Sequence, residues 1–149
     1  MTIAFDSNIL VCTLEPGVSS RKGRADELLV RSLRNGTDVF LLQALTEFAN
    51  VAVRKLGLPA DAIRRRVDAW QSALPVRSAE TEDALAALDA VRDHRLLFWD
   101  AMLWATARRV GVSALLTEDL PDGRTLQGVR FVNPFNPKND AVVDRLLPP

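Results

Sequence analysis

Short apolar segments alternate with longer helical patterns along most of this 149-residue chain. The apolar segments are predicted strands, and they cover residues 2–5, 38–42, 75–77, 114–117 and 130–132. The predicted helices between them cover residues 20–35, 45–55, 61–74, 81–94 and 98–110. Strands that are apolar throughout are typical of sheets covered on both faces, and helical connections favour parallel pairing. The alternation predicts an α/β fold, namely a three-layer α/β/α domain with a central, mostly parallel sheet.

The chain length suits one domain with a single core. We expect the domain to occupy residues 1–135 and residues 136–149 to form a C-terminal tail, because proline and asparagine are frequent after Asn133. A final helical turn is predicted at residues 141–147. The sequence contains no internal repeat and no linker that would separate a second domain.

Two acidic residues lie just past the ends of predicted strands. Asp6 comes after residues 2–5, and Asp119 comes shortly after residues 114–117. Open parallel sheets bind their ligands outside the carboxyl ends of the strands, so both acids are candidate site residues. Two structural alternatives stay open: Asp6 is also placed to cap a following helix, and Asp119 lies in a segment with the composition of a turn.

Two further acids lie near the starts of helices that are apolar on nearly every side. Glu47 lies in the segment 44–53 and Asp100 in the segment 98–105. Helices with this pattern are expected to be buried, and an unpaired buried carboxylate is costly. Structural alternatives exist here too, because Glu47 could pair with Arg54 and the helix dipole could stabilise Asp100 by ~0.3–1 kcal/mol.

Metal binding gives a chemical reason for collecting four carboxylates. Mg²⁺ and Mn²⁺ prefer carboxylate oxygens and need neither cysteine nor histidine. One or two such ions can activate a water molecule and stabilise the leaving oxygen in phosphodiester cleavage. Without metal the four acids should repel one another, so some of their pKa values should rise.

Other active-site types lack the residues that they need. No GxxxxGK[ST], GxGxxG or GxSxG motif is present, so a phosphate-binding loop and a serine nucleophile elbow are unsupported. The only histidine, His94, lies in a polar helix end, and the only cysteine, Cys12, is expected in the core. A haloacid-dehalogenase-like site needs an acid where Asn8 stands, and a receiver domain needs a lysine that is missing between Lys55 and Lys138.

The formal net charge is zero, so bulk electrostatics do not indicate a nucleic-acid partner. Most of the positive charge is arginine, which suits phosphate recognition, but we interpret the clusters 21–24, 64–66 and 108–109 as solvated helix faces. No apolar run is long enough to span a membrane, and no signal peptide precedes the first strand. With a single cysteine, these features predict a cytoplasmic protein.

Four segments, in their order, resemble the PIN-domain family, and most closely the VapC-type toxin ribonucleases of bacterial toxin–antitoxin pairs. The resemblance extends from about residue 2 to residue 135. These segments are the opening strand with its Asp6-Ser7-Asn8 motif, the helix that begins Trp99-Asp100-Ala101, the strand end Leu116-Thr117-Glu118-Asp119, and the closing strand that ends at Phe135. Glu47 lies where the family has a helix-borne acid after the second strand.

The resemblance implies a metal-dependent endoribonuclease that cleaves single-stranded or structured RNA with Mg²⁺ or Mn²⁺. Its catalytic residues and metal ligands would be Asp6, Glu47, Asp100 and Asp119. Asn8 and Thr117 would orient these ligands. The resemblance also implies a cognate antitoxin protein and a homodimer.

Two questions stay open from the sequence. Asp122 is an alternative to Asp119 as the fourth acid; Asp119 is preferred because it lies two residues after Thr117, and Glu118 should point the other way. The alternative function is a non-catalytic PIN-like module that binds RNA or a protein. Trp70 and the leucines of residues 20–35 and 61–74 are candidates either for an interface or for the core.

Overall fold

The computed structural model describes residues 1–149 and contains a four-stranded sheet of order β1-β4-β6-β5. Its strands are β1 (Ile3–Phe5), β4 (Ala114–Leu116), β5 (Thr125–Leu126) and β6 (Val129–Val132). β1 pairs in parallel with β4 and β4 with β6, whereas β5 is antiparallel to β6. The sheet is therefore mostly parallel, as predicted, and β5 is the one strand that the sequence pattern does not predict.

Two further strands, β2 (Phe40–Leu41) and β3 (Val76–Arg77), form a separate parallel pair. The N–H of Val39 donates a 3.2 Å hydrogen bond to the Ile3 carbonyl, so this pair lies beside β1. The strand predicted over residues 38–42 is shorter than expected, because Leu42 already belongs to the next helix. An unbroken apolar run does not reveal where a strand ends and a buried helix begins.

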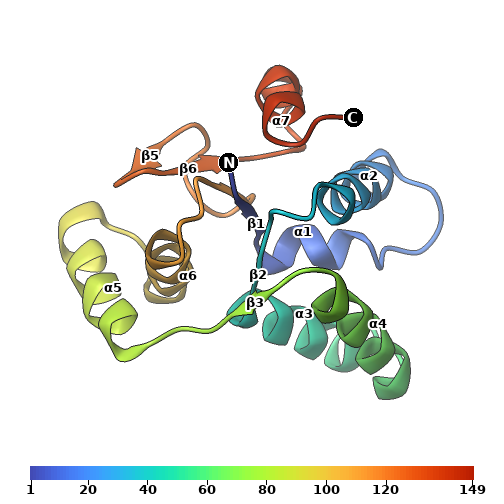
Figure 1. The fold of residues 1–149 in the computed structure, drawn as a ribbon. Helices are drawn as coiled ribbons and strands as arrows, with labels where there is room; N and C mark the ends of the chain where they lie inside the picture. The colour runs from blue at the N-terminus through green and yellow to red at the C-terminus, as the bar shows by residue number, and fades with distance from the viewer.

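Helices enclose the strands on both sides. They are α1 (Ser7–Cys12), α2 (Ser20–Asn35), α3 (Leu42–Arg54), α4 (Ala60–Ala73), α5 (Thr81–His94), α6 (Phe98–Arg109) and α7 (Asp140–Leu146). Figure 1 shows the central strands between the α5–α6 pair on one side and α1 and α2 on the other. The predicted three-layer α/β/α arrangement is confirmed, and no helix has the combined length and apolarity of a membrane-spanning segment.

Local sequence signals explain the ends of α2. The hydroxyl of Ser19 accepts a 3.1 Å hydrogen bond from the Lys22 N–H and so satisfies one free donor of the first turn. At the other end Gly36 adopts the left-handed conformation (φ 70°) and its N–H bonds to the Ser32 carbonyl. Both ends are as the sequence predicts.

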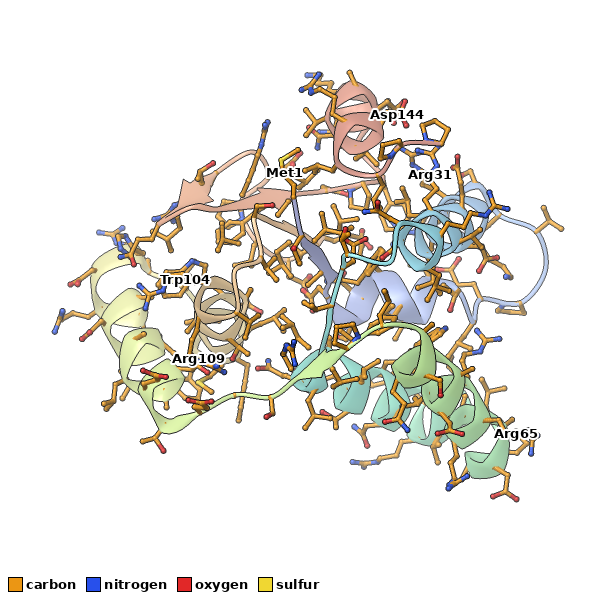
Figure 2. The ribbon with its side chains drawn as sticks, viewed as in Figure 1. Met1, Arg31, Arg65, Trp104, Arg109 and Asp144 are labelled. Atoms are coloured by element: carbon orange, nitrogen blue, oxygen red, sulfur yellow. The ribbon has the colours of Figure 1, made fainter.

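The core contains Trp70, which the sequence left open as an interface residue. Its ring stacks on Phe40 with centroids 5.5 Å apart and contacts Phe48 at 4.9 Å, and it is almost fully buried. Trp104 is also buried and lies between α5 and α6 (Figure 2). By contrast, Arg65 is exposed and points away from the protein on α4, as expected for a solvated helix face.

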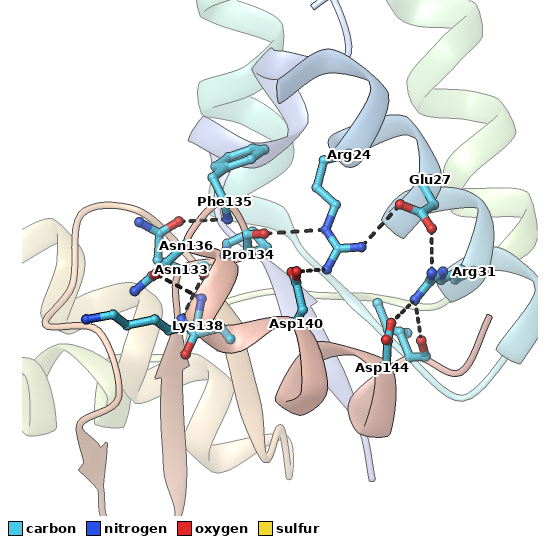
Figure 3. A network of polar contacts seen from close by, with 12 residues as sticks. Arg24, Glu27, Arg31, Asn133, Pro134, Phe135, Asn136, Lys138, Asp140 and Asp144 are labelled. Atoms are coloured by element: carbon cyan, nitrogen blue, oxygen red, sulfur yellow. Dashed lines mark hydrogen bonds and ion pairs between the residues drawn. The ribbon is translucent and has the colours of Figure 1, made fainter. Parts of the chain in front are cut away.

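The C-terminal residues pack against α2. Val143 and Leu147 are buried in the core. Arg24 forms a 3.2 Å ion pair with Asp140, and Arg31 forms one of 2.7 Å with Asp144 (Figure 3). A short 3₁₀ helix, η1 (Pro137–Asn139), leads into α7.

Candidate active site

Asp6 lies immediately after β1 and is the most buried of the four candidate acids, with 5% of its surface exposed. One carboxylate oxygen, Oδ1, accepts a 2.7 Å hydrogen bond from the Ser7 N–H at the start of α1. The other, Oδ2, accepts a 2.7 Å hydrogen bond from the Thr117 hydroxyl. Asp6 therefore does cap α1, and the capping role does not exclude a place in the site.

The pairing of β1 with β4 brings Asp119 to Asp6. Phe5 is in register with Leu116, and the Asp6 N–H donates to the Leu116 carbonyl at 2.9 Å. Thr117, the next residue, also accepts a 3.1 Å hydrogen bond from the Asp119 N–H. Parallel pairing thus places the two strand ends at one edge of the sheet, as expected from the sequence.

Asn8 links the same two acids directly. Its side-chain amide donates to Oδ2 of Asp6 at 3.2 Å and to Oδ2 of Asp119 at 3.0 Å. Two carboxylate acceptors fix the amide's orientation, so its carbonyl oxygen faces elsewhere and is buried without a hydrogen-bond partner. Asn8 and Thr117 are both polar neighbours of the acids, as expected.

Glu47 joins the cluster through two residues that the sequence analysis does not single out. The Ser7 hydroxyl donates to Oε2 of Glu47 at 2.8 Å, and the Gln43 amide donates to Oε1 at 3.1 Å. The expected alternative pair with Arg54 does not form. Two signals could have pointed to these residues: Ser7 lies inside the Asp6-Ser7-Asn8 motif, and Gln43 precedes Glu47 by one helical turn.

Asp100 lies in the first turn of α6 and shares none of these hydrogen-bond donors. Partial burial raises the pKa of Asp100, and the nearby charges of Asp119 and Glu47 raise it further. The Gln43 amide that holds Glu47 also donates to the Trp99 carbonyl at 2.9 Å, which fixes the start of α6 beside α3. Asp100 therefore interacts with Asp119 and Glu47 through charge and not through a shared hydrogen-bond donor.

The expectation that Glu47 and Asp100 are buried is wrong. Both are half-buried, and Asp119 is exposed. Several apolar residues of the two helices face solvent, including Leu42, Val53 and Trp99. An apolar composition on all sides of a short helix does not supply the neighbouring elements that bury it. Here one face of α3 and the start of α6 lie at the protein surface.

Burial also dominates the ionisation of Asp6. Loss of solvent raises its pKa to about 6, and the charges of Asp119 and Glu47 act in the same direction. Hydrogen bonds from Thr117 and Ser7 stabilise the charged form and limit the rise. The expected repulsion between the acids therefore contributes to the raised pKa of Asp6 and of Asp100.

The two rival acids have other partners. Glu118 points away from Asp6 and forms an ion pair with Arg21, as expected. Asp122 accepts hydrogen bonds from the Asn133 N–H at 2.9 Å and from the side-chain amides of Asn136 and Asn139 at 2.8 Å. The structure thus places Asp119 beside Asp6, whereas Asp122 holds the segment that follows β6.

The donor types suit a hard divalent cation. None of the ion pairs in the protein involves the four acids, so their charge is not neutralised by lysine or arginine. The four acids are spaced more widely than the ligands of a bound metal, because no three acidic, histidine or cysteine side chains converge closely enough to hold an ion. Binding would require the side chains to close around the cation.

The chain is similar to known proteins in both sequence and fold. The PIN domain profile matches residues 3–120. The toxin VapC20 of Mycobacterium tuberculosis, a sarcin–ricin loop cleaving toxin, has a similar structure (TM-score 0.64, 19% identity, 78% of this chain and 89% of that chain). A toxin–antitoxin complex from Klebsiella pneumoniae is also similar (TM-score 0.62, 21% identity, 89% of this chain and 98% of that chain). So is a DNA-bound VapBC from Salmonella typhimurium (TM-score 0.62, 18% identity, 88% of this chain and 96% of that chain).

No curated protein sequence matches the chain significantly. At these identities the structural neighbours establish the fold, and the sequence profile establishes the family because it spans most of the chain. This chain belongs to the PIN-domain family.

Proposed function

We propose that the protein is a metal-dependent endoribonuclease that cleaves single-stranded or structured RNA. One observation carries the proposal: Asp6, Glu47 and Asp119 come from different elements and are linked through the side chains of Ser7 and Asn8. Asp100 interacts electrostatically with two of them, and none of the four acids has a cationic partner. A buried carboxylate without a cationic partner, such as Asp6, is costly unless it is hydrogen-bonded, protonated or bound to a metal.

The hydrogen bonds suggest a role for each residue. Asp6, fixed by Thr117 and the Ser7 N–H, would be the central metal ligand. Glu47, Asp100 and Asp119 would complete the ligand set. When bound, Mg²⁺ or Mn²⁺ would supply an activated water and stabilise charge on the leaving oxygen.

The polar neighbours would keep the acids oriented. Ser7 and Gln43 hold both oxygens of Glu47, and Asn8 holds Asp6 and Asp119 at a fixed separation. These hydrogen bonds fix the directions in which the carboxylate oxygens point.

We further propose that the protein is the toxin of a toxin–antitoxin pair and acts as a homodimer in the cytoplasm. Support comes from the structural neighbours, which include a sarcin–ricin loop cleaving toxin and a VapBC complex. The partner would be a cognate antitoxin protein. A basic side chain of the antitoxin could be accommodated by the uncompensated acids.

The test is RNA cleavage by the purified protein with Mg²⁺ or Mn²⁺, compared with the same reaction in EDTA. We expect metal-dependent cleavage that Asp6→Asn abolishes and Asp122→Asn retains. Asp122 is the matched control because it is a nearby acid with a structural set of partners. Wild-type cleavage by Asp6→Asn in Mn²⁺ would refute the mechanism.

The second candidate is a non-catalytic PIN-like module that binds RNA or a protein. The loose spacing of the carboxylates favours it. Such a module would bind its partner equally well in EDTA and would leave RNA intact at every metal concentration. An enzyme loses its turnover on chelation, so the two candidates separate cleanly.

A further inference from the structure

The most exposed aromatic side chain of the protein lies next to a candidate metal ligand. Trp99 is 64% exposed and directly precedes Asp100, whereas Trp70 and Trp104 are buried. Phe98 is 37% exposed, and its ring contacts that of Trp99 edge-on with centroids 5.2 Å apart. A mostly exposed indole offers a large, rigid apolar face to a ligand.

The backbone of Trp99 is held in a fixed relation to the acids. The Gln43 amide donates to the Trp99 carbonyl at 2.9 Å and to Oε1 of Glu47 at 3.1 Å. One side chain therefore ties the backbone at Trp99 to the carboxylate of Glu47.

The negative charge of the site means that RNA binding there needs a contact that does not depend on charge. A nucleic acid is a polyanion, and the four acids repel it while no arginine or lysine pairs with them. The net charge of zero provides no general attraction either. Stacking of bases on aromatic rings provides affinity that does not depend on charge, and it accepts any base because every base has a π-face.

We propose that Trp99, supported by Phe98, is a stacking site for an unpaired nucleobase next to the phosphate that the acids engage. This inference rests on the proposed ribonuclease function, since it names how that same site holds its substrate. It assigns Trp99 to substrate positioning. The ligand is single-stranded RNA rather than a duplex, because bases in a helix are already stacked on one another.

The first test measures binding of a short oligoadenylate to the Asp6→Asn protein in Mg²⁺ by tryptophan fluorescence. Trp70 and Trp104 are shielded, so quenching by the oligonucleotide reports on Trp99. We expect oligoadenylate to quench the emission and an abasic strand of the same length to leave it unchanged. Equal quenching by both strands would overturn the proposal, because only one of them can stack.

The second test compares variants by the anisotropy of a labelled oligoadenylate, again in the Asp6→Asn background. Trp99→Ala should weaken binding about five- to a hundredfold, the range expected for loss of one base–aromatic stack. Trp99→Phe should restore most of the affinity. Leu85→Ala is the matched control, because Leu85 is a comparably exposed apolar residue (62%) on α5 and should leave binding unchanged.

The outcomes separate this inference from the proposed function. Metal-dependent cleavage with the same KM in Trp99→Ala and wild-type protein would overturn the stacking site alone. Trp99-dependent binding without cleavage would support the stacking site and refute the ribonuclease. If Trp99→Ala instead lowers the mass measured by sedimentation, the aromatic pair is an interface between copies of the chain and the proposal is wrong.

Discussion

The Thr117 hydroxyl donates a 2.7 Å hydrogen bond to Oδ2 of Asp6, between residues that are 111 positions apart. Both side chains are almost fully buried at the adjoining ends of β1 and β4. The bond ties the strand ends together and stabilises the charged form of Asp6, the one buried acid of the four. The ionisation of the cluster is therefore coupled to the packing of the sheet.

Replacing Thr117 by valine should remove this donor while keeping the side-chain shape. The pKa of Asp6 should rise further, because the Thr117 hydrogen bond lowers it in the native protein. The acidic limb of the pH–rate profile should then move to higher pH, and unfolding should become easier by about 1–3 kcal/mol because buried partners lose a hydrogen bond. Thr117→Ser retains the hydroxyl, and a profile shifted equally in both variants would contradict this account.

Asp6→Asn should change how stability depends on pH in EDTA. The folded-state pKa is about 6 against an ordinary 3.8, so the folded wild-type protein binds more protons between these values and loses stability as pH rises through that window. The difference of about two pKa units sets an upper limit of about 3 kcal/mol. Asparagine does not titrate, so the variant should match the wild type near pH 4 and be equally or more stable at pH 7–8.

Thermal or denaturant unfolding at several pH values checks this prediction. The gain at neutral pH should fall below the limit, because asparagine accepts weaker hydrogen bonds from the Ser7 N–H than a carboxylate does. Parallel pH curves for the two proteins would mean that Asp6 is not the group with the raised pKa.

Divalent cations should stabilise the wild-type protein. A cation that binds the folded state at about one hundred times its Kd adds about 2.7 kcal/mol to the free energy of unfolding. Mg²⁺ and Mn²⁺ should therefore raise the melting temperature of the wild-type protein, and EDTA should reverse the change. The same titration with Asp6→Asn should give little or no shift, and an equal shift in that variant would place the cation elsewhere.

Asp119→Asn and Asp122→Asn should have opposite effects. Asp119 shares the Asn8 amide with Asp6, so its loss should reduce cleavage on the order of a hundredfold with little change in stability. Hydrogen bonds from Asn133, Asn136 and Asn139 outweigh the effect of burial and lower the pKa of Asp122. Asp122→Asn should therefore weaken the fold, most clearly above the ordinary carboxyl pKa, and spare cleavage; the reverse pattern would make Asp122 the fourth acid.

Sequence patterns predicted elements well where end signals are strong. Helix α5 has the predicted bounds, and α2 begins and ends at its serine and glycine signals. The start of α3 was predicted three residues too late, because a continuous apolar run does not distinguish strand from helix. The two-residue strand β5 was not predicted, because its pairing with β6, and not its own composition, makes it a strand.

The candidate site was predictable as a set of acids but not as an environment. Strand ends and the family motifs located Asp6 and Asp119. The degree of burial was misjudged, since it depends on elements that pack from elsewhere in the chain: Asp6 is enclosed, whereas Glu47 and Asp100 reach the surface. The division into a domain of residues 1–135 and a tail of residues 136–149 stays a prediction. Ion pairs join this tail to α2.

The strand order has a consequence for synthesis of the protein. β1 emerges from the ribosome long before its neighbour β4, which begins only at residue 114. The hydroxyl group that holds Asp6 follows at residue 117. A nascent chain that ends before this point lacks Thr117 and Asp119, so it holds the first acid without its partners. The cluster can therefore assemble only after residue 119 has been translated, and translation products that end before it would carry no complete site.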